Sequence, residues 1–144
     1  ARTIIAARPV ETTTELAEIT RDAIPAPARR TGGHPAKRTF QAIRIEVNNE
    51  LGVLPVALEA AIDALHPAGR LVVLSYHSGE DRIVKQVMRD AESGGCTCPT
   101  NLPCVCGAKS TVRLVRRGGT TPGVAERERN PRAESARLRI AERS

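Results

Sequence analysis

The run Arg70–Tyr76, with the sequence RLVVLSY, limits the possible folds of this chain more than any other segment. A turn with the sequence HPAG comes before it, and a pattern of helical spacing begins directly after it. A continuous apolar run between such boundaries predicts a strand that is buried on both faces, as the strands of parallel sheets are. Because helical patterns stand on both sides of this strand, we expect an α/β fold.

Apolar residues at helical spacing predict five helical segments. They cover residues 1–7, 13–24, 40–51, 55–65 and 78–91. Gly52 is expected to separate the third of these helices from the fourth. Thr12 with Glu15, and Ser78 with Asp81, have the spacing of a helix N-cap and the third helical residue.

The aromatic content restricts the core. The chain has one Phe, one Tyr and no Trp, so its core must be built from Ala, Val, Ile and Leu, and stacking platforms for single-stranded nucleic acid are excluded. Two shorter strands are predicted at Thr111–Arg116 and Ala136–Ile140, where apolar and basic residues alternate. A linker rich in Pro, Gly and Arg at residues 26–33 predicts a boundary between residues 1–31 and 32–144.

The net charge of +6 is concentrated near the end of the chain. Residues 107–144 carry 10 of the 22 Lys and Arg residues but only 4 of the 16 Asp and Glu residues. Such a basic region is typical of a surface that faces phosphate, although a solubilising tail has the same composition. No apolar run approaches the length of about 18 residues that a membrane helix needs, and residues 1–9 do not resemble a secretory signal. We therefore expect a cytoplasmic protein with no membrane partner.

The segment that follows the apolar strand is the first candidate site. In open α/β sheets, ligands bind beyond the carboxyl ends of the strands, where Ser75–Arg82 would lie. His77, Ser78 and Glu80 are the candidate functional side chains in it. The alternative is that Ser78 only caps a helix and that Glu80 only favours its N-terminus.

A second candidate is the basic segment His34–Gln41 at the start of a predicted helix. Basic side chains and free backbone N–H groups at a helix start can bind phosphate. A solvated helix start is the alternative, and the sequence alone does not decide between the two.

Four cysteines within eleven residues form the third candidate. Cys96, Cys98, Cys104 and Cys106 have the pattern CxC-x5-CxC in a loop that we place at residues 93–107. Four thiolates can close a tetrahedral zinc site, whose role would be structural because no ligand position stays open. Free thiols, or disulfides formed on oxidation, are the alternatives.

Four segments of the chain resemble the MraW family of bacterial 16S ribosomal RNA cytosine-N4 methyltransferases. They are Pro9–Ile19, His34–Leu51, Gly69–Lys85 and Asn130–Glu142. The resemblance covers almost the whole chain, and the second and third segments are the most specific. It departs from the family at Gly79, where Leu is usual, and at Glu134, where a basic residue is usual. The family's glycine-rich cofactor loop has no counterpart in this sequence.

The resemblance implies the C-terminal part of a Rossmann-like, S-adenosylmethionine-dependent methyltransferase fold. Residues 1–31 would end a helical insert, and residues 32–144 would belong to the methyltransferase domain. The enzyme methylates N4 of a cytidine in 16S ribosomal RNA of the small ribosomal subunit. The main cofactor ligands would lie outside this chain, in an N-terminal half, so that the chain alone would be incomplete.

The resemblance also implies roles for the candidate residues. His77 and Ser78 would hydrogen-bond at the target-base side of the site, and Glu80 would orient its neighbours. We expect RNA contacts from two groups of side chains. They are His34, Lys37, Arg38, Gln41 and Arg44 in the first group, and Arg113, Arg116, Arg117, Arg137 and Arg139 in the second.

Other functions remain compatible with the sequence. The chain could be a non-catalytic RNA-binding module that zinc stabilises. It could also need to pair with a separate N-terminal half, or form a homodimer through the same surface. Binding of S-adenosylmethionine and association state would separate these alternatives.

Overall fold

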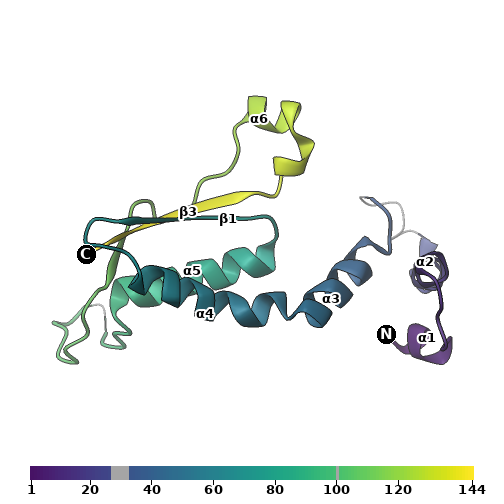
Figure 1. The fold of residues 1–144 in the computed structure, drawn as a ribbon, viewed down its shortest axis with the longest axis horizontal. Helices are drawn as coiled ribbons and strands as arrows, with labels where there is room; N and C mark the ends of the chain where they lie inside the picture. The colour runs from purple at the N-terminus through teal and green to yellow at the C-terminus, as the bar shows by residue number, and fades with distance from the viewer. Residues whose placement is uncertain (27–32, 100) are drawn as a thin grey trace. The chain divides into compact units, whose positions relative to one another are not determined.

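The computed structural model describes residues 1–26, 33–99 and 101–144, which form two compact units, Ala1–Glu50 and Leu51–Ser144 (Figure 1). The boundary expected between residues 31 and 32, and most of the expected linker, lie outside the described residues. No helix in the described ranges is both long enough and apolar enough to cross a membrane.

The described part of the first unit contains the helices α1 (Arg2–Ala6), α2 (Thr13–Asp22) and α3 (Lys37–Asn48). The predicted N-cap of α2 is confirmed, because Thr12 Oγ1 accepts a hydrogen bond from the Glu15 N–H at 3.1 Å. The break expected at Gly52 is wrong. The chain turns at Asn49 instead, whose φ of 49° is left-handed, a conformation that Asn tolerates better than most residues.

Helix α4 (Glu50–Asp63) therefore runs through Gly52 and contains Pro55. It leads through a turn at residues 64–69 to the strand β1 (Arg70–Ser75), which ends at the predicted strand end to within one residue. Helix α5 (Ser78–Ser93) follows at once, and strands β2 (Val112–Leu114) and β3 (Arg137–Arg143) complete the sheet.

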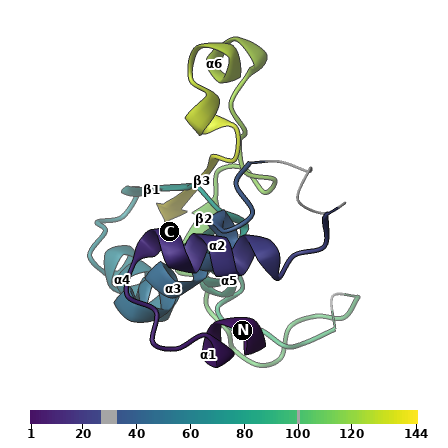
Figure 2. The same ribbon diagram turned by 90° about the vertical axis from the view of Figure 1, so that its right-hand side faces the viewer.

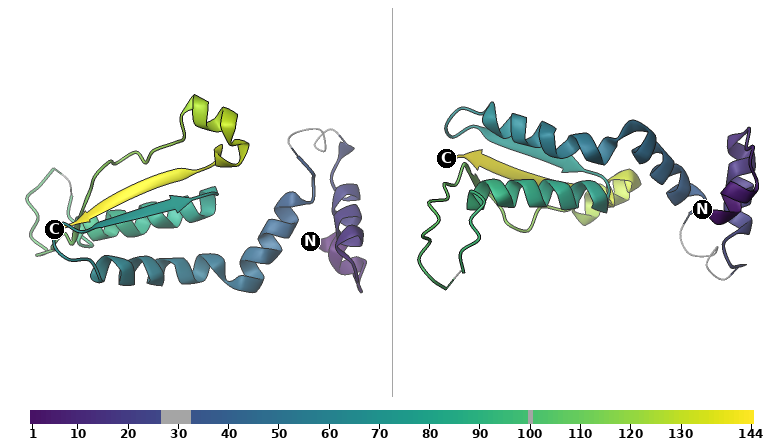
Figure 3. Two further views of the ribbon diagram at one scale, coloured as in Figure 1. Left: turned by 45° about the horizontal axis from the view of Figure 1, so that its top comes forward. Right: turned by 90° about the horizontal axis from the view of Figure 1, so that it is seen from below.

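The sheet has the order β1-β3-β2, and both of its pairings are antiparallel. Val72 lies opposite Ile140, and Val112 lies opposite Arg143. Strands β1 and β2 therefore run in the same direction but are separated by β3. Figure 3 shows the arrows of β1 and β3 side by side and pointing in opposite directions. The prediction of an α/β fold is confirmed at this level, whereas the one pairing of β1 within the described residues is antiparallel and does not confirm the expected parallel sheet. The neighbour of β1 is supplied by the last strand of the chain, which returns in the opposite direction.

The core lies between one face of the sheet and helices α4 and α5 (Figures 1 and 3). Its buried members are Leu58 and Ile62 from α4, Val84 and Met88 from α5, Val112 from β2 and Ala141 from β3. The predicted aliphatic core is thus confirmed, with one methionine added to it.

The opposite face of the sheet stays open in the described part of the chain. Val72 is 55% exposed and Leu74 is 50% exposed, so burial alternates along β1. The expected burial of β1 on both faces is therefore wrong. One face of β1 stays open because both covering helices, α4 and α5, pack on the other face.

The connection from β2 to β3 carries the short helix α6 (Val124–Arg129) and a 3-10 turn at Pro131–Ala133. Figure 2 shows α6 on the side of the sheet opposite helices α4 and α5. Thr120 fixes this connection to β3 by two backbone hydrogen bonds with Leu138, of 2.8 and 2.9 Å. The connection therefore returns to the sheet beside β3, at the level of the end of β1, because Leu138 lies opposite Leu74.

The core assignment predicts unequal effects of two truncations. Met88→Ala removes a fully buried side chain, and we expect it to lower the free energy of unfolding by about 2–5 kcal/mol. Val53→Ala removes an exposed side chain on α4 and should change that free energy by less than about 0.5 kcal/mol. Urea denaturation followed by circular dichroism measures both, since the chain has no Trp for fluorescence. Equal losses in the two variants would contradict the assigned core.

Candidate functional site

The turn from β1 to α5 is held by His77. Its backbone is extended, with φ −140° and ψ 160°, and its Nδ1 accepts hydrogen bonds from the N–H groups of Gly79 (3.1 Å) and Glu80 (3.3 Å). His77 is therefore the N-cap of α5. The prediction that Ser78 is the N-cap is wrong, because Ser78 already belongs to the helix and the imidazole of the preceding residue takes its place.

Glu80 closes the same turn from the other side. Its Oε2 accepts hydrogen bonds from the N–H groups of Tyr76 (2.8 Å) and His77 (3.1 Å), which completes a capping box. The second nitrogen of His77, Nε2, is buried and lies 3.4 Å from Glu80 Oε1 without forming a hydrogen bond. Both side chains thus fix the backbone at the strand end, while Ser78 is exposed at the first turn of the helix.

A second contact ties this helix start to the neighbouring strand. The guanidinium of Arg139 on β3 donates two hydrogen bonds to Asp81, of 2.7 and 3.0 Å. The side chains are 11% and 20% exposed, so the pair is largely shielded from solvent. These hydrogen bonds lower the pKa of the Asp81 carboxyl below its usual range, against the opposing effect of burial, and the positive charge of Arg139 lowers it further.

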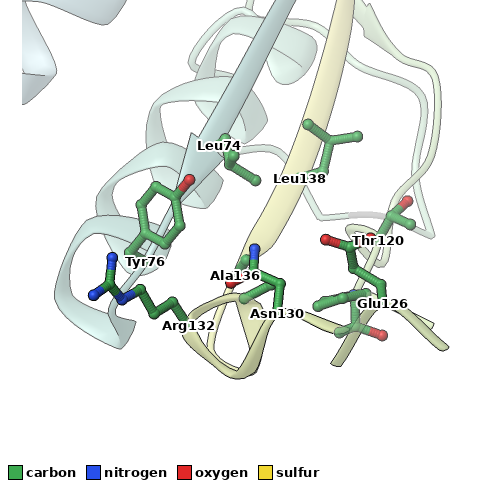
Figure 4. A pocket seen from close by; sticks show the side chains of 11 residues that line it. Leu74, Tyr76, Thr120, Glu126, Asn130, Arg132, Ala136 and Leu138 are labelled. Carbon is green, nitrogen blue, oxygen red and sulfur yellow. The ribbon is translucent and has the colours of Figure 1, made fainter. Parts of the chain in front are cut away.

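A pocket of about 810 Å³ opens beyond the end of β1. Leu74 and Leu138, which lie opposite each other on β1 and β3, form its apolar part together with Ala136 (Figure 4). This volume lies in the range of pockets that hold small molecules or single groups of larger ligands. The pocket is therefore lined by the open face of the sheet and by the connection from β2 to β3.

Polar groups surround the apolar part of this pocket. Tyr76 and Arg132 lie on one side of it, and Thr120 and Glu126 lie on the other, with Asn130 between them (Figure 4). Tyr76 belongs to the candidate segment Ser75–Arg82, whereas sequence reasoning missed the other four as site residues. For Asn130 and Arg132 the family resemblance of the segment Asn130–Glu142 was a signal, but Thr120 and Glu126 had none.

The first group of expected RNA-binding residues lies around α3. His34 Nδ1 accepts a hydrogen bond from the Ala36 N–H at 3.2 Å, so this side chain helps to form the helix start. Lys37 and Arg38 are exposed in the first turn, and Gln41 is half-buried. Arg44 donates two hydrogen bonds to Glu50, of 2.9 and 3.0 Å. The basic helix start expected from the sequence is thus present in the first unit.

The second group divides by its partners. Arg139 is engaged by Asp81, and Arg113 donates to Glu142 at 2.7 Å. Glu142 also accepts from Arg70 at 2.8 Å, and the hydrogen bonds from Arg70 and then Arg113 lower the pKa of this carboxyl. The side chains left exposed to a polyanion are those of Arg116, Arg117 and Arg137.

The four cysteines meet in the loop after α5. Their sulfur atoms all lie within 4.8 Å of one another, and no disulfide links them. A backbone hydrogen bond from Val105 lowers the pKa of the Cys98 thiol. For Cys96, a backbone hydrogen bond from Cys98 lowers the pKa, but the neighbouring thiols of Cys104 and Cys106 outweigh it and raise the pKa to about 12.

Comparisons with known proteins agree over the whole chain. The sequence model of the MraW methylase family matches residues 1–144. A ribosomal RNA small subunit methyltransferase H from Heliobacterium mobile is 53% identical over 137 residues, which are 94% of this chain and 44% of that protein. The protein of the same name from Salinispora tropica is 57% identical over 137 residues, which are 94% of this chain and 36% of that relative.

A third relative of the same name, from Frankia alni, is 56% identical over 149 residues that cover 100% of this chain and 45% of that protein. The chain therefore spans less than half the length of each of these three relatives.

The pair of Asp81 and Arg139 predicts a pH-dependent stability. Because the pKa of Asp81 is lower in the folded chain than the unfolded value of about 3.9, the pair stabilises the fold above about pH 4 and loses this effect as the pH falls through the folded-state pKa. Asp81→Asn should lower the free energy of unfolding at pH 7 by about 2 kcal/mol and make it less sensitive to acid. Urea denaturation at pH 7 and at pH 3 measures both effects.

The matched control is Asp63→Asn, which removes the carboxylate of an exposed pair with Arg143. That Asp63 side chain is 80% exposed, and its oxygen lies 3.7 Å from the Arg143 nitrogen. We expect almost no change in this variant, because exposed pairs contribute little. Equal effects of the two substitutions would argue against a special role of the Asp81 pair.

Proposed function

The chain belongs to the MraW methylase family, and we therefore propose that it forms the C-terminal part of an S-adenosylmethionine-dependent methyltransferase. The proposed reaction is methylation of N4 of a cytidine in 16S ribosomal RNA of the small subunit. The names of the relatives support a small-subunit ribosomal RNA substrate. The observation within the chain that carries the proposal is the pocket beyond the carboxyl end of β1.

The pocket suits a nucleobase in size and in chemistry. Its apolar part, at Leu74 and Leu138, offers a surface for the faces of a ring, and the polar side chains around it offer donors and acceptors for the ring edge. Tyr76 is the only aromatic residue among the pocket-lining residues, and it lies at the mouth of the pocket beside Arg132. We assign the target-base wall to this pocket.

The chemistry explains why positioning matters here. The exocyclic amine of cytosine is a weak nucleophile because its lone pair is conjugated with the ring. Transfer to it therefore depends on alignment of the nitrogen with the methyl carbon and on an acceptor for its protons. Ser78 is exposed at the helix start, two residues after the pocket-lining Tyr76, and we assign the contact with the bound base to it.

His77 and Glu80 act through the backbone in this proposal. The Nδ1 of His77 is occupied by two N–H groups and its Nε2 is buried, so neither nitrogen is open to a base in the described part of the chain. Glu80 is likewise engaged by two N–H groups. Both are positioning residues that hold Tyr76 and Ser78 at the strand end.

We propose that this chain supplies only part of the cofactor site. The turn from β1 to α5 contains no glycine-rich loop, and its one glycine, Gly79, lies inside the helix with its missing Cβ only 3.1 Å from the His77 ring. When bound, S-adenosylmethionine supplies an electrophilic methyl group. We propose that its main ligands belong to the part of the family that this chain does not include.

The free edge of β1 supports the proposal of a larger, Rossmann-like sheet. Within the described residues, β3 is the only strand paired with β1, so the other edge of β1 is free. Val72 leaves an apolar surface beside that edge, next to the pocket that Leu74 lines. We propose that the N-terminal part of the relatives covers this surface. A homodimer through the same surface is the alternative, and the association state of the chain in solution distinguishes the two.

The function is tested with a chimaera that joins this chain to the part of the Salinispora tropica relative outside the matched region. We expect the chimaera to bind S-adenosylmethionine and to transfer a methyl group to N4 of one cytidine in small ribosomal subunits, as measured by calorimetry and by mass spectrometry of RNA digests. The chain alone should do neither. Micromolar binding of S-adenosylmethionine by the chain alone would overturn the proposed division of the cofactor site.

Substitutions in the chimaera separate contact from positioning. Ser78→Ala and His77→Ala should each lower the methylation rate about tenfold, the former by loss of a contact and the latter by loss of a cap worth about 1 kcal/mol. His77→Asn should restore the rate, because Asn is an equally good N-cap. A folded chimaera that binds RNA but never methylates it would favour a non-catalytic RNA-binding module instead.

The exposed arginines predict a change in the salt dependence of RNA binding. Arg116→Glu with Arg117→Glu should reduce the slope of log affinity against log salt by about 0.7 for each phosphate that the protein no longer neutralises. Filter binding of a 16S ribosomal RNA fragment at several salt concentrations measures this slope.

The control changes the net charge equally at a different place. Arg2→Glu with Arg8→Glu reverses two exposed arginines of the first unit. If both double variants alter the slope alike, the effect comes from net charge rather than from contacts at Arg116 and Arg117.

A further inference from the structure

The cysteine loop, residues 93–107, brings four thiols together far from any apolar core. Cys104 Sγ lies 3.4 Å from Cys96 Sγ and 3.3 Å from Cys106 Sγ, and the sulfur atoms of Cys96 and Cys106 are 3.6 Å apart. The Cys98 sulfur lies within 4.8 Å of the other three. Neither the pocket nor the turn at the end of β1 involves any of these cysteines.

The spacing of the sulfurs matches that around a single metal ion. Zinc binds thiolates at about 2.3 Å, so the sulfurs at the corners of a regular tetrahedron around it are about 3.8 Å apart. The three separations among Cys96, Cys104 and Cys106 lie slightly below this value. An iron–sulfur cluster places several iron and sulfide ions between its cysteines and needs sulfurs that are farther apart.

Packing does not explain why the thiols converge. The two large apolar side chains described in the loop, Leu102 and Val105, are 61% and 90% exposed. A loop of this length without an apolar core has little to offset the entropy lost on ordering. In the described part of the loop, its first side, with Cys96 and Cys98, meets its second side, with Cys104 and Cys106, at the four thiols.

Backbone contacts at the base of the loop hold its first and last residues together. Gly94 adopts a left-handed φ of 63° and lies so close to Lys109 that a Cβ would collide with the Lys109 backbone. The Thr111 N–H donates to the Ala91 carbonyl at 2.9 Å, which joins the end of α5 to the segment before β2. The chain thus enters and leaves the loop at one fixed point, and all four cysteines lie in the sequence between Gly94 and Lys109.

We propose that Cys96, Cys98, Cys104 and Cys106 bind one Zn²⁺ ion in a closed, structural site. All four positions of the tetrahedron are filled by thiolates, so the ion has no open position for a substrate or for water. Binding replaces the S–H bonds by Zn–S bonds and releases the thiol protons to solvent. The ion orders the loop that connects α5 with β2. This inference does not depend on the proposed methyltransferase function.

Metal analysis of the purified full chain, kept reduced and dialysed against a weak chelator, tests the proposal. We expect about one zinc per chain and, after exchange with Co²⁺, the absorption bands of a tetrahedral thiolate complex. Cys104→Ser with Cys106→Ser should hold less than about one tenth of that zinc and show no such bands. Removal of zinc by a strong chelator should loosen the base of the loop, so that trypsin cleaves after Lys109, two residues beyond the loop, while the rest of the chain stays resistant.

The matched control is Val105→Ala, which changes an exposed residue between two of the cysteines and should keep the full zinc content. Three results would overturn the proposal. They are a folded chain without zinc and without a Co²⁺ spectrum, a mass that is lower by four hydrogens because two disulfides have formed, and iron with inorganic sulfide in place of zinc.

Discussion

The ion pair between Asp81 and Arg139 is the contact on which the candidate site depends. It joins residues 58 positions apart, because Asp81 stands in the first turn of α5 and Arg139 stands in the middle strand. The same turn carries the capping box of His77 and Glu80. Strand end, helix start and β3 are therefore fixed to one another by charge-assisted hydrogen bonds.

Local patterns were sufficient to predict the elements but not their partners. The apolar run predicted β1 almost to the residue, and Thr12 was correctly predicted as the cap of α2. Apolar continuity, however, does not state which strand will lie beside β1. The antiparallel pairing with β3 depends on residues more than 60 positions later, which no local pattern contains. The cap of α5 was placed one residue too late for a different reason, since His is a rare N-cap and Ser is a common one.

The candidate site divides in the same way. The four cysteines could be named as a candidate site from their spacing alone, because all four stand in one short segment. The pocket could not be predicted so, since its wall combines β1 with the connection from β2 to β3. Tyr76 and Arg132 both line it, and the hydrogen bonds between Thr120 and Leu138 attach the connection to β3. Arg139 was predicted to contact RNA because it belongs to the basic region at residues 107–144. Its position opposite Val73, however, directs its side chain toward Asp81 on α5.

The shared carboxylate of Glu142 has a consequence for how the strands find their alignment. Arg70 on β1 and Arg113 on β2 both donate to it, so one row of charges crosses all three strands. Side chains alternate between the two faces of a strand. A slip of β3 by one residue would therefore carry Glu142 under the helices and turn Ala141 out of the core. Only one register satisfies both the charges and the apolar contacts, and the sheet is protected against misalignment even though it has only three strands.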